Sequence, residues 1–214
     1  MNNLFITLEG PEGGGKTSQA KSLAEYLRAE KFEVLLTREP GGSPIGDQIR
    51  KVITQLENTA MDPHTEFLLF SASRAQHIAE VIRPSLEEGM IVISDRFYDS
   101  SLAYQGYGQR LTLETLKAIT NFATSGLTPD LTLLLDLPVE EGLRRREADG
   151  NWNRLDAYDI DFHRRVRSGY LKLAAEEPDR WVVLSAEQSF ETLQEEIRRT
   201  AMVRLRAEAI DTNK

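Results

Sequence analysis

Residues 10–17 constrain the fold more than any other part of the chain, because they match the pattern G-x-x-x-x-G-K-[ST] in full. A short apolar run, Leu4–Leu8, precedes the match, and a segment with helical spacing of apolar residues, Lys16–Glu30, follows it directly. A strand, a glycine-rich turn and a helix in this order predict a loop that binds the phosphates of a nucleoside triphosphate. The residues assigned to this loop are Gly10, Pro11, Glu12, Gly13, Gly14, Gly15, Lys16 and Thr17.

Each part of the loop has a physical task. Glycines let the backbone curl around an anion with its N–H groups pointing inward, and the start of the helix adds positive potential. Lys16 is expected to reach the β and γ phosphates, and Thr17 to ligate Mg²⁺. The motif indicates nucleotide binding but does not name the reaction, because one fold hosts many chemistries.

Short runs rich in leucine and β-branched residues alternate with longer amphipathic segments. The runs lack strict polar alternation, which is typical of parallel strands covered on both faces. We therefore predict a three-layer α/β sandwich with a five-stranded parallel sheet, of the P-loop NTPase type, in a single domain over residues 1–214. The predicted strands are Leu4–Leu8, Val34–Thr37, Ile91–Ser94, Leu131–Leu135 and Trp181–Leu184. The predicted helices are Lys16–Glu30, Pro44–Leu56, His64–Glu87, Thr112–Ser125, Val139–Glu147, Asp159–Glu176 and Phe190–Ala207.

The composition argues against several classes of function. A formal net charge of −8 disfavours a polynucleotide partner, which clustered positive charge would attract. The chain has no cysteine, which excludes disulfides and thiolate metal sites. The N-terminus lacks the features of a signal peptide, and no stretch approaches the roughly 18 apolar residues of a membrane span. We expect a soluble, cytoplasmic protein without a membrane partner.

Four further segments suggest a second ligand beside the nucleotide. They are residues 38–42 after the second predicted strand, 70–74 in a long helix, 95–97 after the third strand, and 100–105. Ligands gather at the carboxyl ends of the strands in an open parallel sheet, so the loops opened by Glu9, Arg38, Asp95 and Asp136 should share one crevice. Taken singly, each segment also fits a structural role: Arg38 or Arg74 could pair with a surface carboxylate, and Phe70 could belong to the core.

Taken together, Thr37–Gly42, Phe70–Arg74 and Ile93–Gln105 resemble the thymidylate kinases in order and in sequence, over residues 4 to about 185. The resemblance implies a fold like that of the nucleoside monophosphate kinases. It also implies transfer of the γ-phosphoryl group of ATP to dTMP, giving dTDP for dTTP synthesis. Mg²⁺ as the cofactor and a homodimer as the assembly follow from the same resemblance, with the long helix His64–Glu87 as one contributor to the dimer contact.

The resemblance also implies roles for the residues that would bind dTMP. Phe70 would stack on the thymine ring, Arg74 would donate to a base carbonyl, and Ser101 and Gln105 would contact the base edge or the nearby phosphate. Stacking contributes roughly 1–3 kcal/mol per base but discriminates little, so the hydrogen-bonding groups must select the pyrimidine. The remaining assignments place Arg96, helped by Arg38 and Arg50, on the acceptor phosphate, Glu12 near the 3′-hydroxyl, and Tyr104 where it would exclude a 2′-hydroxyl.

Two aspartates compete for the metal. Asp95 follows a buried strand, as a metal-orienting aspartate does in P-loop enzymes, and we prefer it, together with Thr17, for Mg²⁺. Asp136, in Leu-Leu-Leu-Asp-Leu-Pro, is the alternative, and it also fits a hydrogen-bonded loop cap.

A polar stretch with a central glycine, at about residues 144–158, predicts a mobile lid. In the family, forms without a basic residue inside the P-loop draw one from the lid, and residues 11–14 here are Pro, Glu, Gly and Gly. The resemblance therefore implies Arg154 as a catalytic residue beside Lys16 and Arg96, while Arg145 is the candidate for packing on the adenine. The attacking group is an ionised phosphate oxygen, so alignment and charge stabilisation suffice for in-line transfer.

Two other functions remain open at this point. One is a related P-loop kinase that acts on another monophosphate or small metabolite. The other is a nucleotide-dependent switch or partitioning ATPase that acts by binding partners. The second is disfavoured because the sequence has no guanine-reading N-K-x-D and because the acceptor-like segments would be unexplained.

Overall fold

The computed structural model of the protein describes residues 3–148, 150 and 152–211. Its centre is a five-stranded sheet in which all strands are parallel, in the order β2-β3-β1-β4-β5. The sheet confirms the predicted one, with each strand shifted or extended by one residue. The strands are β1 (Phe5–Glu9), β2 (Val34–Arg38), β3 (Ile91–Asp95), β4 (Leu131–Asp136) and β5 (Trp181–Ser185).

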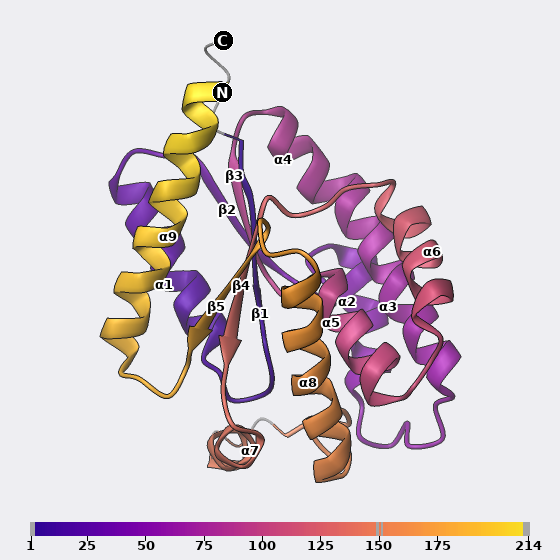
Figure 1. Ribbon diagram of the computed structural model, residues 1–214. Helices are drawn as coiled ribbons and strands as arrows, with labels where there is room; N and C mark the ends of the chain where they lie inside the picture. The colour runs from indigo at the N-terminus through magenta and orange to yellow at the C-terminus, as the bar shows by residue number, and fades with distance from the viewer. Residues whose placement is uncertain (1–2, 149, 151, 212–214) are drawn as a thin grey trace.

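Helices cover both faces of the sheet, so the predicted three-layer α/β sandwich is confirmed (Figure 1). On one face lie α1 (Lys16–Ala29) and α9 (Phe190–Asp211), and on the other α3 (Pro63–His77) and α8 (Ile160–Glu176). The remaining helices are α2 (Pro44–Thr54), α4 (Arg83–Glu87), α5 (Tyr98–Ser101), α6 (Leu113–Thr124) and α7 (Val139–Ala148), with π-helical turns η1 (Ile78–Ile82) and η2 (Leu102–Gly108).

The alternation of side chains along β1 supplies both apolar layers. Ile6 and Leu8 belong to the cluster with α1 and α9, whereas Phe5 belongs to the cluster with α3, η2 and α8. All three side chains are buried, and full burial of such a side chain stabilises the fold by about 1.5–3 kcal/mol. No helix within residues 3–148 and 152–211 is both long enough and apolar enough to cross a bilayer.

Side-chain caps fix the starts of three helices that border the site. Ser43 accepts from the N–H of Gly46 at the start of α2, and Asp62 accepts from the N–H groups of His64 and Thr65 at the start of α3. Asp159 does the same for Phe162 at the start of α8. A short polar side chain at this position satisfies N–H groups that have no partner within the helix.

The prediction of one continuous helix over His64–Glu87 is wrong for its middle part, residues 78–82. The structure has α3, then the π-helical turn η1, then α4. Pro84 has no N–H to donate to the preceding turn, and the N–H of Arg83 donates to the carbonyl of Ile78, five residues back. The backbone therefore widens just before the proline instead of continuing as a regular helix.

Helix α5 and turn η2 were not predicted from the sequence. Nearly every residue from Tyr98 to Gly108 is buried, so the segment has no polar face that would reveal a helical period. These turns follow β3 directly and place the side chains of residues 100–105 next to the end of the central strand β1.

Candidate active site

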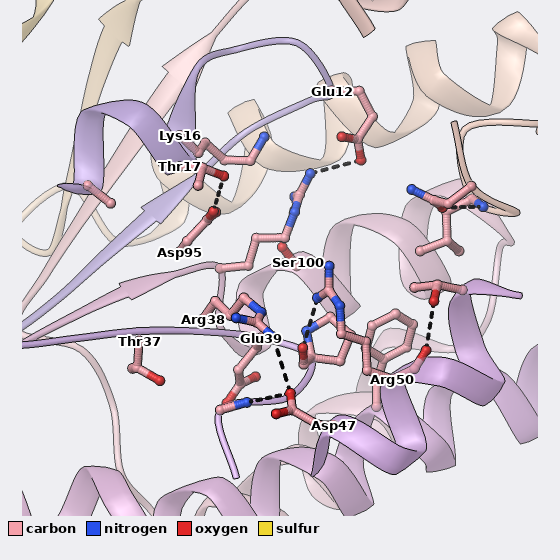
Figure 2. Close-up of a pocket in the computed structure, with 18 of the residues that line it drawn as sticks. Glu12, Lys16, Thr17, Thr37, Arg38, Glu39, Asp47, Arg50, Asp95 and Ser100 are labelled. Carbon is pink, nitrogen blue, oxygen red and sulfur yellow. Dashed lines mark hydrogen bonds and ion pairs between the residues drawn. The ribbon is translucent and has the colours of Figure 1, made fainter. Parts of the chain in front are cut away.

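A cavity of about 1030 Å³ opens at the carboxyl ends of β1, β2 and β3. This is where an open α/β sheet binds ligands, because neighbouring connections leave on opposite faces there. Glu12, Lys16 and Thr17 lie on one side of the cavity, and Arg38, Asp47 and Arg50 lie on the other (Figure 2). Of the loops predicted to share one crevice, those after β1, β2 and β3 do share it, whereas Asp136 after β4 is not among the described residues that line it.

The P-loop is held in shape by its neighbours. Gly13 has a φ of +72°, and a Cβ there would lie 2.2 Å from the carbonyl oxygen of Gly142 in α7, so only glycine fits. Lys16 Nζ donates to the carbonyl of Pro11 at 2.7 Å. Burial and the nearby Arg96 lower the pKa of Lys16 to about 8. A phosphate in the loop would raise this pKa again, because an anion favours the charged form of the lysine.

Thr17 and Asp95 lie together beside the P-loop lysine (Figure 2). The hydroxyl of Thr17 donates to Oδ2 of Asp95, and both residues line the cavity. Asp136, the alternative metal residue, is held by Arg167 through two contacts of 2.7 and 2.8 Å. Hard oxygen donors beside a phosphate-binding loop suit Mg²⁺, so Thr17 and Asp95 fit the ion and Asp136 is already paired with a cation.

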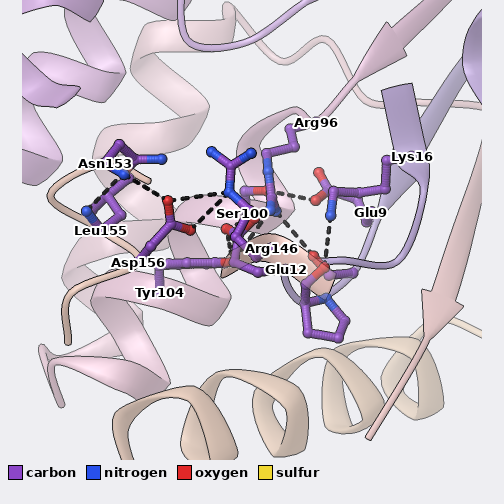
Figure 3. A network of polar contacts seen from close by, with 12 residues as sticks. Glu9, Glu12, Lys16, Arg96, Ser100, Tyr104, Arg146, Asn153, Leu155 and Asp156 are labelled. Atoms are coloured by element: carbon purple, nitrogen blue, oxygen red, sulfur yellow. Dashed lines mark hydrogen bonds and ion pairs between the residues drawn. The ribbon is translucent and has the colours of Figure 1, made fainter. Parts of the chain in front are cut away.

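Arg96 is the centre of the polar network in Figure 3. Its Nη1 donates to the carbonyl of Gly10 at 3.0 Å, and its Nη2 donates to Glu12 Oε1 at 2.8 Å. Further partners of the same guanidinium are Ser100, Tyr170 and Tyr104, at 3.1, 3.0 and 3.2 Å. A left-handed backbone, with φ of +72°, turns the side chain back toward β1. Arg96 thereby joins the P-loop to the segment after β3.

Two carboxylates in this network, Glu12 and the fully buried Glu9, have opposite pKa shifts. Burial alone raises the pKa of Glu12, but Arg96 and Lys16 outweigh it and lower the pKa to about 2. Burial and the charge of Asp99 raise the pKa of Glu9 to about 7, against the opposing effect of Arg96. Glu9 accepts from the N–H of Phe97 at 2.7 Å and from Ser100 Oγ at 2.6 Å. Glu12 is therefore the anion that faces Arg96, whereas Glu9 anchors the loop after β3.

The predicted base-binding residues are not all at the cavity wall. Phe70, Ser101, Tyr104 and Gln105 line it, whereas Arg74 is 1% exposed and is not among the described residues that do. Tyr104 donates its hydroxyl proton to Glu12 Oε1 at 2.7 Å. The ring of Phe70, the hydroxyls of Ser101 and Tyr104 and the amide of Gln105 thus belong to the cavity wall, and Arg74 is buried behind them.

Arg74 is fixed in that buried position by three acceptors. Its Nε donates to Glu39 Oε2 at 2.7 Å, and its Nη2 donates to Ser101 Oγ at 3.1 Å and to the carbonyl of Phe97 at 3.3 Å. Among the described residues, its Nη1 has no hydrogen-bond partner. His77 Nδ1 donates to Oε1 of Glu39 at 3.1 Å, and His77 Nε2 shares a hydrogen bond of 2.7 Å with the hydroxyl of Thr37.

Sequence reasoning did not assign roles to Glu39, His77 or Glu66. Glu39 lies in the segment Arg-Glu-Pro-Gly-Gly, which was noted, but its position next to Arg74 depends on packing between residues 35 positions apart. His77 and Glu66 carry no local signal, because their partners come from other elements.

The arginines predicted for the acceptor phosphate, Arg38 and Arg50, both line the cavity. Arg38 is half exposed and lies 3.3 Å from Asp47. Arg50 Nη1 donates to the carbonyl of Pro40 at 2.8 Å. Burial and the charge of Arg38 lower the pKa of Arg50, which is the effect expected where cations gather for an anion.

The four arginines of the predicted lid, residues 144–158, lie in different places; positions 149 and 151 are outside the described residues. Arg144 is exposed and pairs with Glu141 at 2.8 Å. Helix α7 extends into this segment as far as Ala148. Arg145 and Arg146 line the cavity, and Arg146 contacts Asp156 at 3.2 Å. Arg154 is buried elsewhere: it pairs with Glu66 and donates to the carbonyl of Ile53 at 2.8 Å.

The placement of Arg154 differs from its predicted catalytic position. Its side chain is 6% exposed, and it is not among the described residues of the cavity wall. The sequence could not reveal this, because the carboxylate that holds Arg154 lies 88 positions away in α3.

This fold and this site together define a P-loop kinase of the nucleoside monophosphate kinase type. A parallel sheet carries the P-loop after its central strand, and the cavity beside the P-loop is also lined by an aromatic ring and an amide, those of Phe70 and Gln105. Among solved structures, the chain is similar to the crystal structure of thymidylate kinase from Ehrlichia chaffeensis, with a TM-score of 0.78 and 32% identity. The match covers 94% of this chain and 98% of that one.

The particular family follows from the sequence comparisons. A family model described as thymidylate kinase matches residues 8–197. The chain is 51% identical to thymidylate kinase of Roseiflexus castenholzii over 208 residues, which cover 91% of each chain. It is 52% identical to thymidylate kinase of Deinococcus radiodurans over 194 residues, or 91% of this chain and 94% of that one. The chain belongs to the thymidylate kinase family, and the resemblance read from its motifs is confirmed.

Proposed function

We propose that this protein transfers the γ-phosphoryl group of ATP to dTMP and so makes dTDP for dTTP synthesis. The observation that carries the proposal is that one continuous cavity is lined both by Lys16 of the P-loop and by Phe70, Tyr104 and Gln105. Family membership supports the same reaction. Donor and acceptor would thus meet in one space, which is what transfer without a covalent intermediate requires.

The donor half would be formed by residues 10–17. Their backbone N–H groups and Lys16 would bind the triphosphate, and Arg145 would pack near the adenine. Arg145 Nη1 also donates to the carbonyl of Ala186 at 3.1 Å, which would keep its side chain against the cavity wall. Mg²⁺ would be held by Thr17 and Asp95 and would neutralise charge on the phosphates.

The acceptor half would be formed by the residues after β2 and β3. Arg96, Arg38 and Arg50 would bind the phosphate of dTMP, because planar guanidinium groups suit phosphate oxygens. Glu12 would lie near the 3′-hydroxyl, and the ring of Tyr104, whose hydroxyl donates to Glu12, would exclude a 2′-hydroxyl. A deoxyribose would be preferred for this steric reason.

The base would stack on Phe70 and would be read by polar groups beside it. Arg74 Nη1 is a buried donor without a partner among residues 3–148 and 152–211, and Ser101 links Arg74 to the cavity wall. An unmade hydrogen bond of a buried donor costs about 1–3 kcal/mol, which a base carbonyl would restore.

The lid would contribute a cation to the transition state. Arg146 lines the cavity. Burial raises the pKa of Glu12, whereas Arg96, Lys16 and, to a smaller extent, Arg146 lower it. We therefore add Arg146 as a candidate beside Lys16 and Arg96. A direct role of Arg154 stays a prediction, and it would require the salt bridge to Glu66 to open.

The protein would act in the cytoplasm as a homodimer, with one kinase domain over residues 1–214 and a lid at about 144–158. Two exposed apolar residues support an interface at the outer helices. Leu68 of α3 is 52% exposed and Phe122 of α6 is 86% exposed. Light scattering coupled to gel filtration would test the dimer directly, and a mass of one chain would contradict it.

The reaction is tested by ADP release from ATP·Mg in the presence of dTMP, dUMP, UMP, CMP, AMP or GMP. We expect a dominant rate with dTMP. Activity mainly with another monophosphate would keep the P-loop mechanism but remove the assignment of Phe70, Arg74 and Tyr104. Release that is independent of any acceptor would favour the switch ATPase.

A further inference from the structure

Glu66 is a fully buried carboxylate in the first turn of α3, and four side chains donate to it. Its Oε1 accepts from Gln105 Nε2 and from Gln109 Nε2, each at 2.7 Å. Its Oε2 pairs with Arg154 and accepts from the hydroxyl of Tyr158 at 3.2 Å. Burying a charged carboxylate costs desolvation free energy, which hydrogen bonds and an ion pair must offset. The four donors supply these contacts and fix the orientation of the carboxylate.

The contact with Gln105 fixes the direction of an amide at the cavity wall. Gln105 lines the cavity and is 1% exposed. Its Nε2 points to Glu66, whereas its Oε1 has no hydrogen-bond partner in the described part of the chain. An ionised carboxylate can only accept hydrogen bonds. Reversing the amide would therefore place Oε1 against a carboxylate oxygen, and this repulsion keeps the buried acceptor oxygen turned away from Glu66 and unpaired among the described residues.

The direction of this amide matters for a pyrimidine base. Thymine presents an N3–H donor, which an amide oxygen accepts. Cytosine presents N3 as an acceptor, which would need the amide reversed so that its NH₂ group donates. A buried pair of two acceptors leaves both without a hydrogen bond, and such a mismatch is what allows a polar site to reject a close analogue.

We propose that Glu66 is a positioning residue for base selection: it holds the carboxamide of Gln105 with Oε1 available, so that the acceptor pocket takes a base with an N3–H and rejects cytosine. The inference rests on the proposed dTMP kinase activity. Glu66 does not itself touch the substrate in this account; it acts through Gln105.

The same carboxylate connects base selection to the lid segment. Arg154 and Tyr158 both follow α7, and both hold Oε2 of Glu66. Because Arg154 supplies the balancing charge, the fixed amide depends on residues 154–158 being in place. This gives the buried position of Arg154 a function that its predicted catalytic role did not include.

The test compares wild type with Glu66→Gln. Glutamine has nearly the same shape but both donates and accepts, so either direction of the Gln105 amide becomes satisfied. We expect the ratio of kcat/KM for dTMP to kcat/KM for dCMP to fall at least tenfold. The ratio of kcat/KM for dTMP to kcat/KM for dUMP should stay within about twofold of the wild-type ratio, because both bases carry the N3–H. A general loss of structure would not change the first ratio while leaving the second one unchanged.

Gln109→Met is the matched control. Gln109 donates to the same oxygen of Glu66, but it is not among the described residues that line the cavity. Its loss should lower the melting temperature without changing the dTMP to dCMP ratio. If Glu66→Gln fails to fold because it leaves Arg154 unpaired, the double variant Glu66→Gln/Arg154→Met removes both charges and carries the same ratio test.

The outcomes separate this inference from the proposed function. A wild-type enzyme that prefers dTMP, together with a folded Glu66 variant that keeps the wild-type dTMP to dCMP ratio, overturns the role of Glu66 alone. A wild-type protein that releases no ADP in response to dTMP overturns the proposed function and this inference with it.

Discussion

Arg96→Lys probes the residue on which both halves of the site depend. The guanidinium donates to five acceptors on five different residues, at 2.8–3.2 Å. An ammonium group keeps the charge but has three donors on one atom, so at least two of the five acceptors lose their hydrogen bond. Hydrogen bonds of charged groups contribute about 1.5–3 kcal/mol each. The free energy of unfolding should therefore fall by about 3 kcal/mol or more.

The same substitution should weaken acceptor use. Loss of one such bond to the phosphate of dTMP, about 1.5–3 kcal/mol, corresponds to roughly 10- to 150-fold in kcat/KM for dTMP. Urea unfolding and initial rates would measure the two effects separately. Arg38→Lys is the control, because Arg38 is half exposed and its ion pair with Asp47 is 3.3 Å long, so its unfolding free energy should change by less than about 1 kcal/mol. An Arg96→Lys variant with wild-type stability and wild-type kcat/KM would refute the reasoning.

Three further predictions follow from the same network. Tyr104→Ala should admit the ribonucleotide analogue of dTMP, whereas Tyr104→Phe should keep the preference for the deoxyribonucleotide. Competition kinetics would measure this preference, and the same value in both variants would rule out a steric role of the ring. Although burial opposes it, Arg96 and Lys16 lower the pKa of Glu12 from 4.5 to about 2, so the ionised carboxylate stabilises the fold above pH 4.5 and this contribution is lost as the pH falls toward 2. Urea titrations should show wild type losing up to about 3 kcal/mol relative to Glu12→Gln across that window, and parallel curves would exclude the ion pair as the cause. Arg146→Ala should lower kcat with little change in KM for ATP. Arg154→Ala should instead reduce thermal stability, because it leaves the buried Glu66 without its ion-pair partner. The reverse pattern would return the catalytic role to Arg154.

The sequence predicted those parts of the fold whose signals are local. A glycine-rich motif between a strand and a helix specifies the P-loop, and continuous apolar runs specify buried parallel strands, so both were found within one residue of their observed bounds. The effect of Pro84 was also readable in principle, since a proline in a helical pattern removes a backbone donor. It was missed because apolar residues keep a helical spacing through the interruption.

The parts that sequence reasoning did not reach depend on distant partners. Arg74 lies behind the pocket because Glu39 holds it, and Arg154 is buried because Glu66 holds it. Neither carboxylate lies within 30 residues of its arginine. Local patterns report charge and exposure along one element, and they cannot report which charges meet when two elements pack together.

The most direct test of the account is transfer of label from ATP labelled at the γ phosphate to dTMP, followed by separation of the nucleotides. We predict that label appears in the β phosphate of dTDP, one equivalent for each ADP formed, and that Lys16→Ala abolishes it. Label recovered as inorganic phosphate at the same rate with and without dTMP would contradict the account and would identify an ATPase instead.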